Sequence, residues 1–134
     1  MTHEYKSIAH AKTNLRYHVI LSTKYRRKAL VGIEQTVLEA FRDAESHSDF
    51  RIIEMNADQD HIHLLVTFKP ALSIEQVVRR MKQLTTRYVW EREAEHLRMY
   101  YWKDKRVLWT GGYFCATVGD ASEEQMVEYI RKQG

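Results

Sequence analysis

The order of strand-like and helix-like patterns along this chain constrains its fold more than any other feature. Residues 15–22 alternate apolar and polar side chains, which is the period-two mark of a strand. Residues 50–56 and 61–68 are also rich in β-formers and flank a short turn, so they predict a hairpin. Apolar residues at helical spacing predict a helix of about 15 residues from Ile33 and a longer one from Ser73.

The end of the chain predicts one more strand and one more helix. After two consecutive glycines, residues 113–118 ("YFCATV") indicate a strand, and residues 122–133 favour a helix. Residues 91–112 are charged and then aromatic, and they predict no particular element. The complete order, βαββαβ followed by a helix, is that of a ferredoxin-like α+β sandwich with an antiparallel sheet. In that fold the first and third strands form the central pair, so residues 61–68 are expected in mid-sheet.

Length and composition predict a single domain, residues 1–134, with no disulfide and no membrane segment. A chain of 134 residues can bury a core of its own, and its single cysteine, Cys115, excludes an internal disulfide. No window approaches the roughly 20 apolar residues of a membrane span. The first residues lack the apolar stretch of a signal peptide. A cytoplasmic location with no membrane partner is therefore expected.

The formal net charge is only +3, so the clustering of the cations matters more than their number. One cluster is "KYRRK" at residues 24–28, and a second lies on the predicted long helix. Such clusters suit a polyanion, although solvated faces are the alternative. Aromatic residues lie among further cations in 100–109, where base stacking competes with core packing as the explanation; core packing is favoured for Trp109, and both stay open for Tyr101 and Trp102. The candidate DNA-binding residues are Lys24, Tyr25, Arg26, Arg27, Arg79, Lys82, Arg87, Lys103, Lys105 and Arg106.

Two histidines, His61 and His63, stand one residue apart in the strand "HIHLLVTF". Alternation places both on one side of the strand, within reach of one metal ion, and imidazole is the commonest metal ligand. On the pair alone a structural role is favoured over metal binding, and in either role a polar partner is expected beside it, because an unpaired imidazole is costly to bury. The alternation predicts that one set of residues faces the helices, namely Ile62, Leu64, Val66 and Phe68. The opposite, open face then carries His61, His63, Leu65 and Thr67.

The last predicted helix carries a tyrosine and a glutamine on one face. Tyr129 and Gln133 are four residues apart in "YIRKQ", and Val127 and Ile130 supply the apolar contacts of the helix. Tyr129 lies to the side of that apolar stripe. It is therefore either an amphipathic residue at the rim of the interface or a nucleophile.

Three stretches together resemble the small insertion-sequence transposases of the HUH (His-hydrophobic-His), single-tyrosine class, often called TnpA. They are "YHVILSTKYRRKAL" (17–30), "DHIHLLVTF" (60–68) and "LWTGGYFCATVG" (108–119) leading to "YIRKQ". The resemblance implies that His61, His63 and Gln133 bind a divalent metal, Mg²⁺ or alternatively Mn²⁺. It also implies that Tyr129 is the nucleophile that attacks a DNA phosphodiester.

The resemblance further implies a reaction and a set of partners. Attack by the tyrosine would leave a 5′-phosphotyrosine link and a free 3′-hydroxyl, and another 3′-hydroxyl would reseal the strand without ATP. Members of this class act on single-stranded DNA with hairpin ends. They work as homodimers in which the tyrosine helix, moving on a hinge at Gly119 and Asp120, completes the partner's site. A proline commonly precedes the Asp-His pair in this class, and Gln59 replaces it here.

Three other functions are compatible with parts of the sequence. A domesticated relative would process dispersed palindromic repeats instead of moving an insertion sequence. A non-catalytic module would hold single-stranded nucleic acid on its open sheet face, although His61 and His63 occupy positions where such modules place aromatic rings. A metal hydrolase using activated water would leave Tyr129 without a role.

Overall fold

The computed structural model describes residues 15–102, 105–119 and 122–133 as a four-stranded antiparallel sheet with helices on both faces. The strands are β1 (Arg16–Ser22), β2 (Phe50–Ala57), β3 (His61–Phe68) and β4 (Phe114–Val118). They lie in the order β2-β3-β1-β4, with β1 and β3 central. The helices are α2 (Glu34–Ser46), α3 (Ile74–Leu97) and α4 (Glu123–Gln133), with a short 3₁₀ turn, η1 (Lys24–Arg26). The predicted ferredoxin-like α+β order with an added helix is confirmed.

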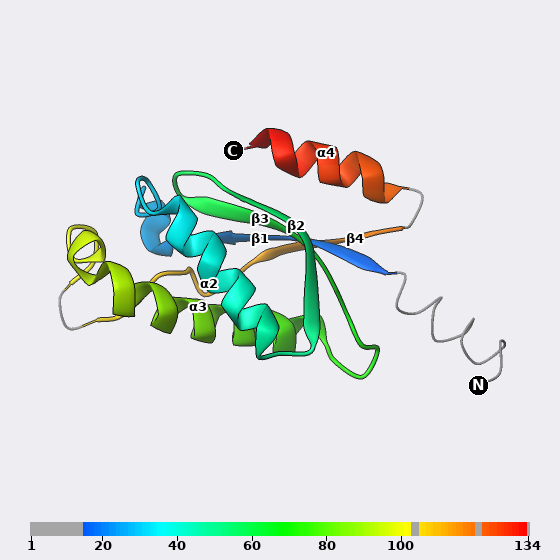
Figure 1. The fold of residues 1–134 in the computed structure, drawn as a ribbon, viewed down its shortest axis with the longest axis horizontal. Helices are drawn as coiled ribbons and strands as arrows, with labels where there is room; N and C mark the ends of the chain where they lie inside the picture. Colours follow the sequence, from blue (N-terminus) through cyan, green and yellow to red (C-terminus); the bar gives the residue numbers. More distant parts are fainter. Residues whose placement is uncertain (1–14, 103–104, 120–121, 134) are drawn as a thin grey trace, which may run out of the picture.

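The two faces of the sheet have different partners. Helices α2 and α3 lie on one side of the sheet and α4 on the other (Figure 1). The first face holds the main core, which includes Val19, Ile62 and Leu64, all fully buried. Leu65 belongs instead to a small cluster with Val118 and Ile130 of α4. The predicted division of β3 into two faces is therefore confirmed, but α4 covers part of the face that was expected to be open.

Helix α3 begins where the sequence predicts and continues further than the pattern indicated. Ser73 is its N-cap: the backbone N–H of Gln76 donates to the Ser73 hydroxyl (3.1 Å), and the Ser73 N–H donates to the Gln76 side chain (2.9 Å). The helix runs on to Leu97, past an irregular residue at Glu93. Its last turns are held by the burial of Trp90 and Leu97. No described helix is long and apolar enough to cross a membrane.

The segment between α3 and β4 packs Trp109 into the core, as expected. The Trp109 ring meets Phe41 edge to face, with 5.8 Å between ring centres. Its indole N–H donates to the hydroxyl of the fully buried Thr85 (3.0 Å), which in turn donates to the Met81 carbonyl (2.6 Å). Tyr101 is also buried, whereas the Trp102 side chain is 76% exposed. Core packing is thus confirmed for Tyr101 and not for Trp102, and base stacking by Trp102 stays a prediction.

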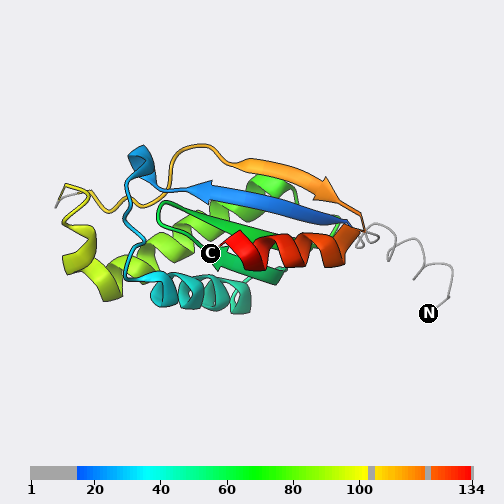
Figure 2. The same ribbon diagram turned by 90° about the horizontal axis from the view of Figure 1, so that it is seen from above.

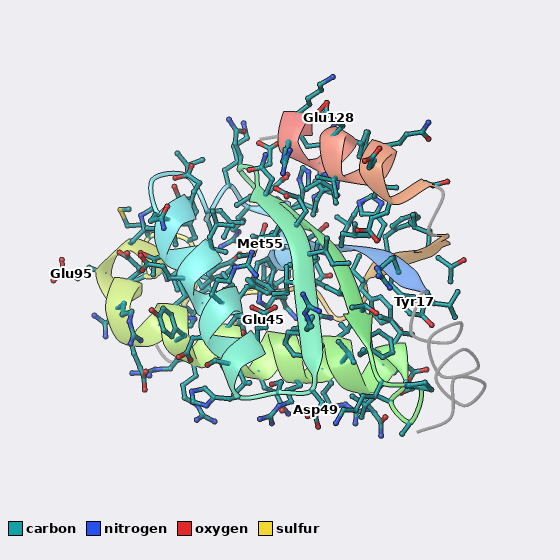
Figure 3. The ribbon with its side chains drawn as sticks, turned by 45° about the vertical axis from the view of Figure 1, so that its right-hand side comes forward. Tyr17, Glu45, Asp49, Met55, Glu95 and Glu128 are labelled. Atoms are coloured by element: carbon teal, nitrogen blue, oxygen red, sulfur yellow. The ribbon has the colours of Figure 1, made fainter. Side chains whose placement is uncertain are left out.

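Helix α4 lies mainly against β2 and β3 (Figure 2), and of the edge strand β4 it reaches the last residue, Val118. Its central contact is Ile130, which is fully buried against Leu65 and Val118. The Asn56 side-chain amide of β2 donates to the carbonyls of Ile130 and Arg131 (both 3.1 Å), two groups that the end of a helix leaves without partners. Glu128 points away from the sheet (Figure 3).

Candidate functional site

Three histidines from the two central strands meet beneath α4. His61 and His63 lie on β3, and their ring centres are 4.9 Å apart. His18 comes from β1, where the strand register pairs it with Leu65, so it projects from the same face as His63. Nε2 of His18 lies 3.0 Å from Nδ1 of His63. His18 and His63 are both buried, while His61 is partly exposed. The polar partner expected beside the histidine pair is present.

A carboxylate holds the other histidine. Nδ1 of His61 lies 2.8 Å from an Asp60 carboxylate oxygen, and Arg26 contacts the second oxygen at 3.4 Å. Burial acts to raise the pKa of Asp60, but the hydrogen bond from His61 and the charge of Arg26 outweigh it, so this pKa lies below its usual value. Asp60 is therefore a carboxylate at neutral pH, and Nδ1 of His61 donates its proton to it.

Burial keeps the two inner histidines neutral. The pKa of His63 is lowered to about 4, first by burial and then by the neighbouring His61 and His18. Burial also lowers the pKa of His18. A neutral imidazole has one bare nitrogen and one N–H, and the bare nitrogen is the atom that binds metal. At neutral pH, His63 is thus in the form that a metal site requires.

Tyr129 lies across the two inner histidines. Its ring centre is 5.9 Å from that of His63 and 5.9 Å from that of His18, with ring planes at 83° and 79°. The side chain is 47% exposed, so it occupies the rim of the helix interface as its position beside the apolar stripe indicated. Gln133 lies one turn further along α4 and is half-buried. The structure therefore brings the predicted nucleophile onto the histidines of its own chain.

The donor set at this site fits a divalent cation whose remaining ligands are oxygens. In the described ranges, no group of three or more histidine, cysteine, aspartate or glutamate side chains is placed to hold a metal. Nδ1 is engaged in both His61 and His63, which leaves the Nε2 atom of each ring for a ligand. Nε2 of His61 lies 3.9 Å from an Asp58 oxygen, beyond hydrogen-bonding distance. An imidazole oriented by a carboxylate is the usual arrangement at protein metal sites.

The basic turn η1 adjoins the histidine site. Arg26 reaches Asp60, and the backbone N–H of Thr23 donates to the Asp60 carbonyl (2.9 Å). Tyr25 and Arg26 both have left-handed backbone angles, with φ of 61° and 53°. This conformation is uncommon for residues other than glycine. The Thr23 hydroxyl donates to the Arg27 carbonyl (2.6 Å) and thereby closes the turn.

Cations and aromatic rings from two distant segments meet beside η1. The cations of Lys24 and Arg27 lie 5.6 Å and 5.1 Å from the centre of the Tyr25 ring, which is 66% exposed. The hydroxyl of Tyr101 donates to the Lys24 carbonyl (3.0 Å), and Arg27 donates to the Tyr100 carbonyl. A small hollow of about 100 Å³ results, lined by Lys24, Tyr25, Arg27, Tyr101, Trp102, Lys105 and Val107.

The other candidate DNA-binding residues are dispersed. Arg79 and Arg87 are exposed on α3, the helix on the opposite face of the sheet from α4. Lys82 is half-buried, and its ammonium group donates to the carbonyls of Thr110 (2.8 Å) and Gly112 (2.9 Å). Arg106 is exposed and stands in the sequence between Lys105 and Val107, which line the hollow. Lys103 and the proposed hinge residue Asp120 lie outside the described residues. The DNA-binding roles of all these residues stay predictions.

Comparison with known proteins gives the family. Residues 11–133 match the family model described as "Transposase IS200 like". The chain belongs to the IS200-like transposase family. The transposase is 30% identical over 129 residues to the transposase for insertion sequence element IS200 of Salmonella typhimurium, covering 96% of this chain and 82% of the relative. It is 29% identical over 120 residues to the ISDra2 transposase TnpA of Deinococcus radiodurans, covering 89% and 84%.

Solved structures share the fold of the transposase. A putative transposase from Deinococcus radiodurans R1 superimposes with a TM-score of 0.69 at 24% identity, covering 88% of this chain and 89% of the other. A REP-associated tyrosine transposase bound to a REP hairpin gives a TM-score of 0.62 at 14% identity, covering 89% and 65%. The resemblance inferred from the sequence is thus confirmed at the level of the family. Transposases bind DNA, cut it and join it again.

Sequence reasoning missed two side chains of this site, His18 and Asp60. His18 alternates with apolar residues in β1, on the face opposite Val19, and this signal was present in the sequence. Its contact with His63 depends on the antiparallel register of β1 and β3, which no local pattern specifies. Asp60 immediately precedes the histidine pair, and its carboxylate turns back onto His61. Both residues contact a histidine of the transposase that was predicted to bind metal.

Proposed function

We propose that this transposase cleaves and rejoins single-stranded DNA through a covalent 5′-phosphotyrosine on Tyr129, assisted by a divalent cation at His61 and His63. The observation that carries the proposal is the position of the Tyr129 ring across the ring of His63, 5.9 Å between centres. A tyrosine that served only for packing would not require buried, neutral histidines beneath its ring, whereas a nucleophile beside a metal site would. Gln133, on the same helix, would supply an amide oxygen as the third ligand.

In the proposed reaction each bond that forms is matched by a bond that breaks. The Tyr129 oxygen loses its proton and bonds to the phosphorus, the bond from phosphorus to the 3′ oxygen breaks, and that oxygen takes up a proton. Rejoining is the reverse step with a different 3′-hydroxyl, so the phosphodiester bond energy is retained. A bound Mg²⁺ or Mn²⁺ would polarise the scissile phosphate. His61 and His63 would hold it through Nε2, with their orientation fixed at Nδ1.

The basic turn supports binding of a DNA hairpin near the histidines. Lys24 and Arg27 supply positive charge around the exposed Tyr25 ring, and Arg26 joins this turn to Asp60. Trp102 adds an exposed ring in the same hollow as Lys105. Cations next to exposed rings suit a strand whose bases are unstacked, since each stacked base contributes about 1–3 kcal/mol. A solved relative in fold is described as bound to a REP hairpin.

We further propose that the element moved is an insertion sequence and that the enzyme works as a homodimer. The chain matches curated insertion-sequence transposases at 29–30% identity, against 14% for the REP-associated structure, which favours a mobile element over a domesticated role. The strand β4 lies at the sheet edge with Phe114 51% exposed, and uncovered edge strands are surfaces on which chains pair. Analytical ultracentrifugation of wild type and Phe114→Ser tests the homodimer.

A denaturing-gel assay tests the chemistry. Labelled single-stranded DNA from the flanking hairpin ends is incubated with wild type or with Tyr129→Phe, in Mg²⁺ or in EDTA. We expect a protease-sensitive covalent adduct with the wild type in Mg²⁺ and none in the other three conditions. Cleavage without an adduct, retained by Tyr129→Phe, would indicate a hydrolase that uses water. Binding without cleavage or adduct would make the protein a non-catalytic binder.

Mixing two inactive variants shows which chain supplies the tyrosine. In the structure Tyr129 contacts His18 and His63 of its own chain, so we propose that attack occurs within one chain in this arrangement. Tyr129→Phe mixed with His63→Ala should then form no adduct. Recovery of adduct in the mixture would show that the tyrosine helix completes the partner's site, as the family resemblance implied.

A further inference from the structure

His18 is a buried polar residue that the proposed reaction does not yet use. It lies in the central strand β1, only 6% exposed. Its ring is enclosed by His63 on one side and by the edge-to-face rings of Phe114 (5.8 Å) and Tyr129 (5.9 Å). A phenylalanine would fill such an enclosure at lower cost, because a buried imidazole must be hydrogen-bonded. The presence of an imidazole at this position must therefore be explained by the contacts of its nitrogen atoms.

The two rings are joined edge to edge. Nε2 of His18 and Nδ1 of His63 are 3.0 Å apart, and the ring planes differ by only 14°. These nearly parallel planes fit a hydrogen bond that lies in the plane of both rings. A contact of 3.0 Å between two ring nitrogens requires one of them to be the donor and the other the acceptor. One proton is then shared in this contact, and either His63 or His18 donates it.

The direction of this hydrogen bond decides what His63 can do. If Nδ1 of His63 is the donor, Nε2 of His63 keeps a bare lone pair. If Nε2 of His18 is the donor, Nδ1 of His63 is the acceptor. The proton of the His63 ring is then on Nε2 of His63 and blocks that atom. At the neighbouring His61 the direction is already fixed, because the Asp60 carboxylate can only accept. A metal bound at His61 would therefore use Nε2, and a site built from both histidines requires a bare Nε2 on His63 as well.

We propose that His18 is a positioning residue: its Nε2 accepts the Nδ1 proton of His63 and so holds the Nε2 lone pair of His63 ready for a divalent cation. The inference rests on the proposed metal site. His18 would serve His63 as Asp60 serves His61, and each histidine of the pair would have its own acceptor from a neighbouring position. Partners of this kind usually set the tautomer of a ligand and raise its affinity for metal.

The first test is made on the metal-free wild type, with ¹⁵N-labelled histidine. Long-range ¹H–¹⁵N correlation spectra distinguish an imidazole protonated at Nδ1 from one protonated at Nε2. We expect His63 to be protonated at Nδ1 and His18 to be bare at Nε2. A His63 ring protonated at Nε2 would overturn the proposal. This result is independent of whether the protein forms a covalent adduct with DNA.

A matched pair of variants links the tautomer to metal binding. His18→Gln places an amide oxygen where Nε2 was, whereas His18→Phe keeps the ring and removes the acceptor. Binding of Mn²⁺ is measured without DNA, from the loss of the electron paramagnetic resonance signal of free Mn²⁺. We expect His18→Phe to bind about 10- to 100-fold more weakly than wild type. His18→Gln should bind close to wild type.

The outcomes separate this proposal from the proposed function. Equal weakening in both variants, or none in His18→Phe, would overturn the positioning role while leaving the histidine metal site intact. Absence of Mn²⁺ binding in the wild type would overturn the metal site and the role of His18 together. Because circular dichroism of each variant is recorded in the same samples, a loss of affinity through unfolding would be seen and would count against the proposal.

Discussion

Replacing Ile130 by alanine should release α4 from the sheet while the rest of the protein stays folded. Ile130 is fully buried, and among the described residues its apolar cluster on this face contains two other buried residues, Leu65 and Val118. Truncating a buried isoleucine to alanine costs about 2–5 kcal/mol, and the small size of this cluster favours the lower half, about 2–3 kcal/mol. The main core lies on the opposite face and loses nothing.

The remaining anchors of α4 are polar contacts, and one of them is the ion pair of Arg16 in β1 with Glu123 at 2.8 Å. Asn56 provides two hydrogen bonds to the end of the helix, each contributing about 1 kcal/mol. Arg131 pairs with Glu54 at 3.4 Å on the surface, a contact that contributes at most about 1 kcal/mol. Losing 2–3 kcal/mol should therefore reduce the ratio of docked to undocked α4 by about 30- to 150-fold.

Amide hydrogen exchange measures this change directly. We expect exchange of the α4 amides to accelerate by that factor in Ile130→Ala, while the amides of β1 and β3 keep their protection. Lys132→Ala on the exposed side of α4 is the matched control and should leave exchange unchanged. Equal acceleration in α4 and in the central strands would refute the reasoning, because α4 would then unfold only with the whole domain. Unchanged exchange in α4 would refute the role of Ile130.

Three further perturbations test other parts of the structure. Thr85→Val leaves the buried Trp109 N–H without its acceptor, so the free energy of unfolding in urea should fall by about 1–3 kcal/mol; an unchanged midpoint would contradict this. Trp102→Ala should weaken single-stranded DNA binding by about 1–3 kcal/mol, measured by fluorescence anisotropy, with an unchanged salt dependence. Lys24→Ala should instead reduce the magnitude of the slope of log affinity against log salt concentration by about one. Equal slopes for the wild type and Lys24→Ala would argue against a phosphate contact.

The fold was predictable because its strands and helices carry clear periods. Alternation in β3 placed Ile62 and Leu64 in the core and the two histidines on the other face, and the structure agrees. The end of α3 was not predicted, since Trp90 and Leu97 are separated by charged residues that hide the apolar stripe. Tyr101 and Trp102 could not be separated, because one step along an irregular segment decides which ring is buried.

The candidate site was predictable only where its residues belong to one local pattern. His61 and His63 are neighbours on one strand, and Tyr129 and Gln133 are neighbours on one helix. The contact of His18 with His63 joins positions 45 residues apart and depends on strand pairing. The same holds for α4, whose docking on β3 brings Tyr129 to the histidines through side chains from β2 and β4. Long-range pairing is a property of the assembled sheet.

The left-handed backbone of η1 has a consequence for the affinity of the DNA binding that is proposed for this turn. Two successive non-glycine residues, Tyr25 and Arg26, are held in a conformation that costs each of them about 1 kcal/mol or more. Thr23 and Tyr101 lock the turn before any ligand arrives. Because the chain pays this ordering cost during folding, the proposed binding of DNA by η1 would not have to order the loop again. Glycine at position 25 or 26 would relax the turn, and the rigid presentation of its cations would be lost with the strain.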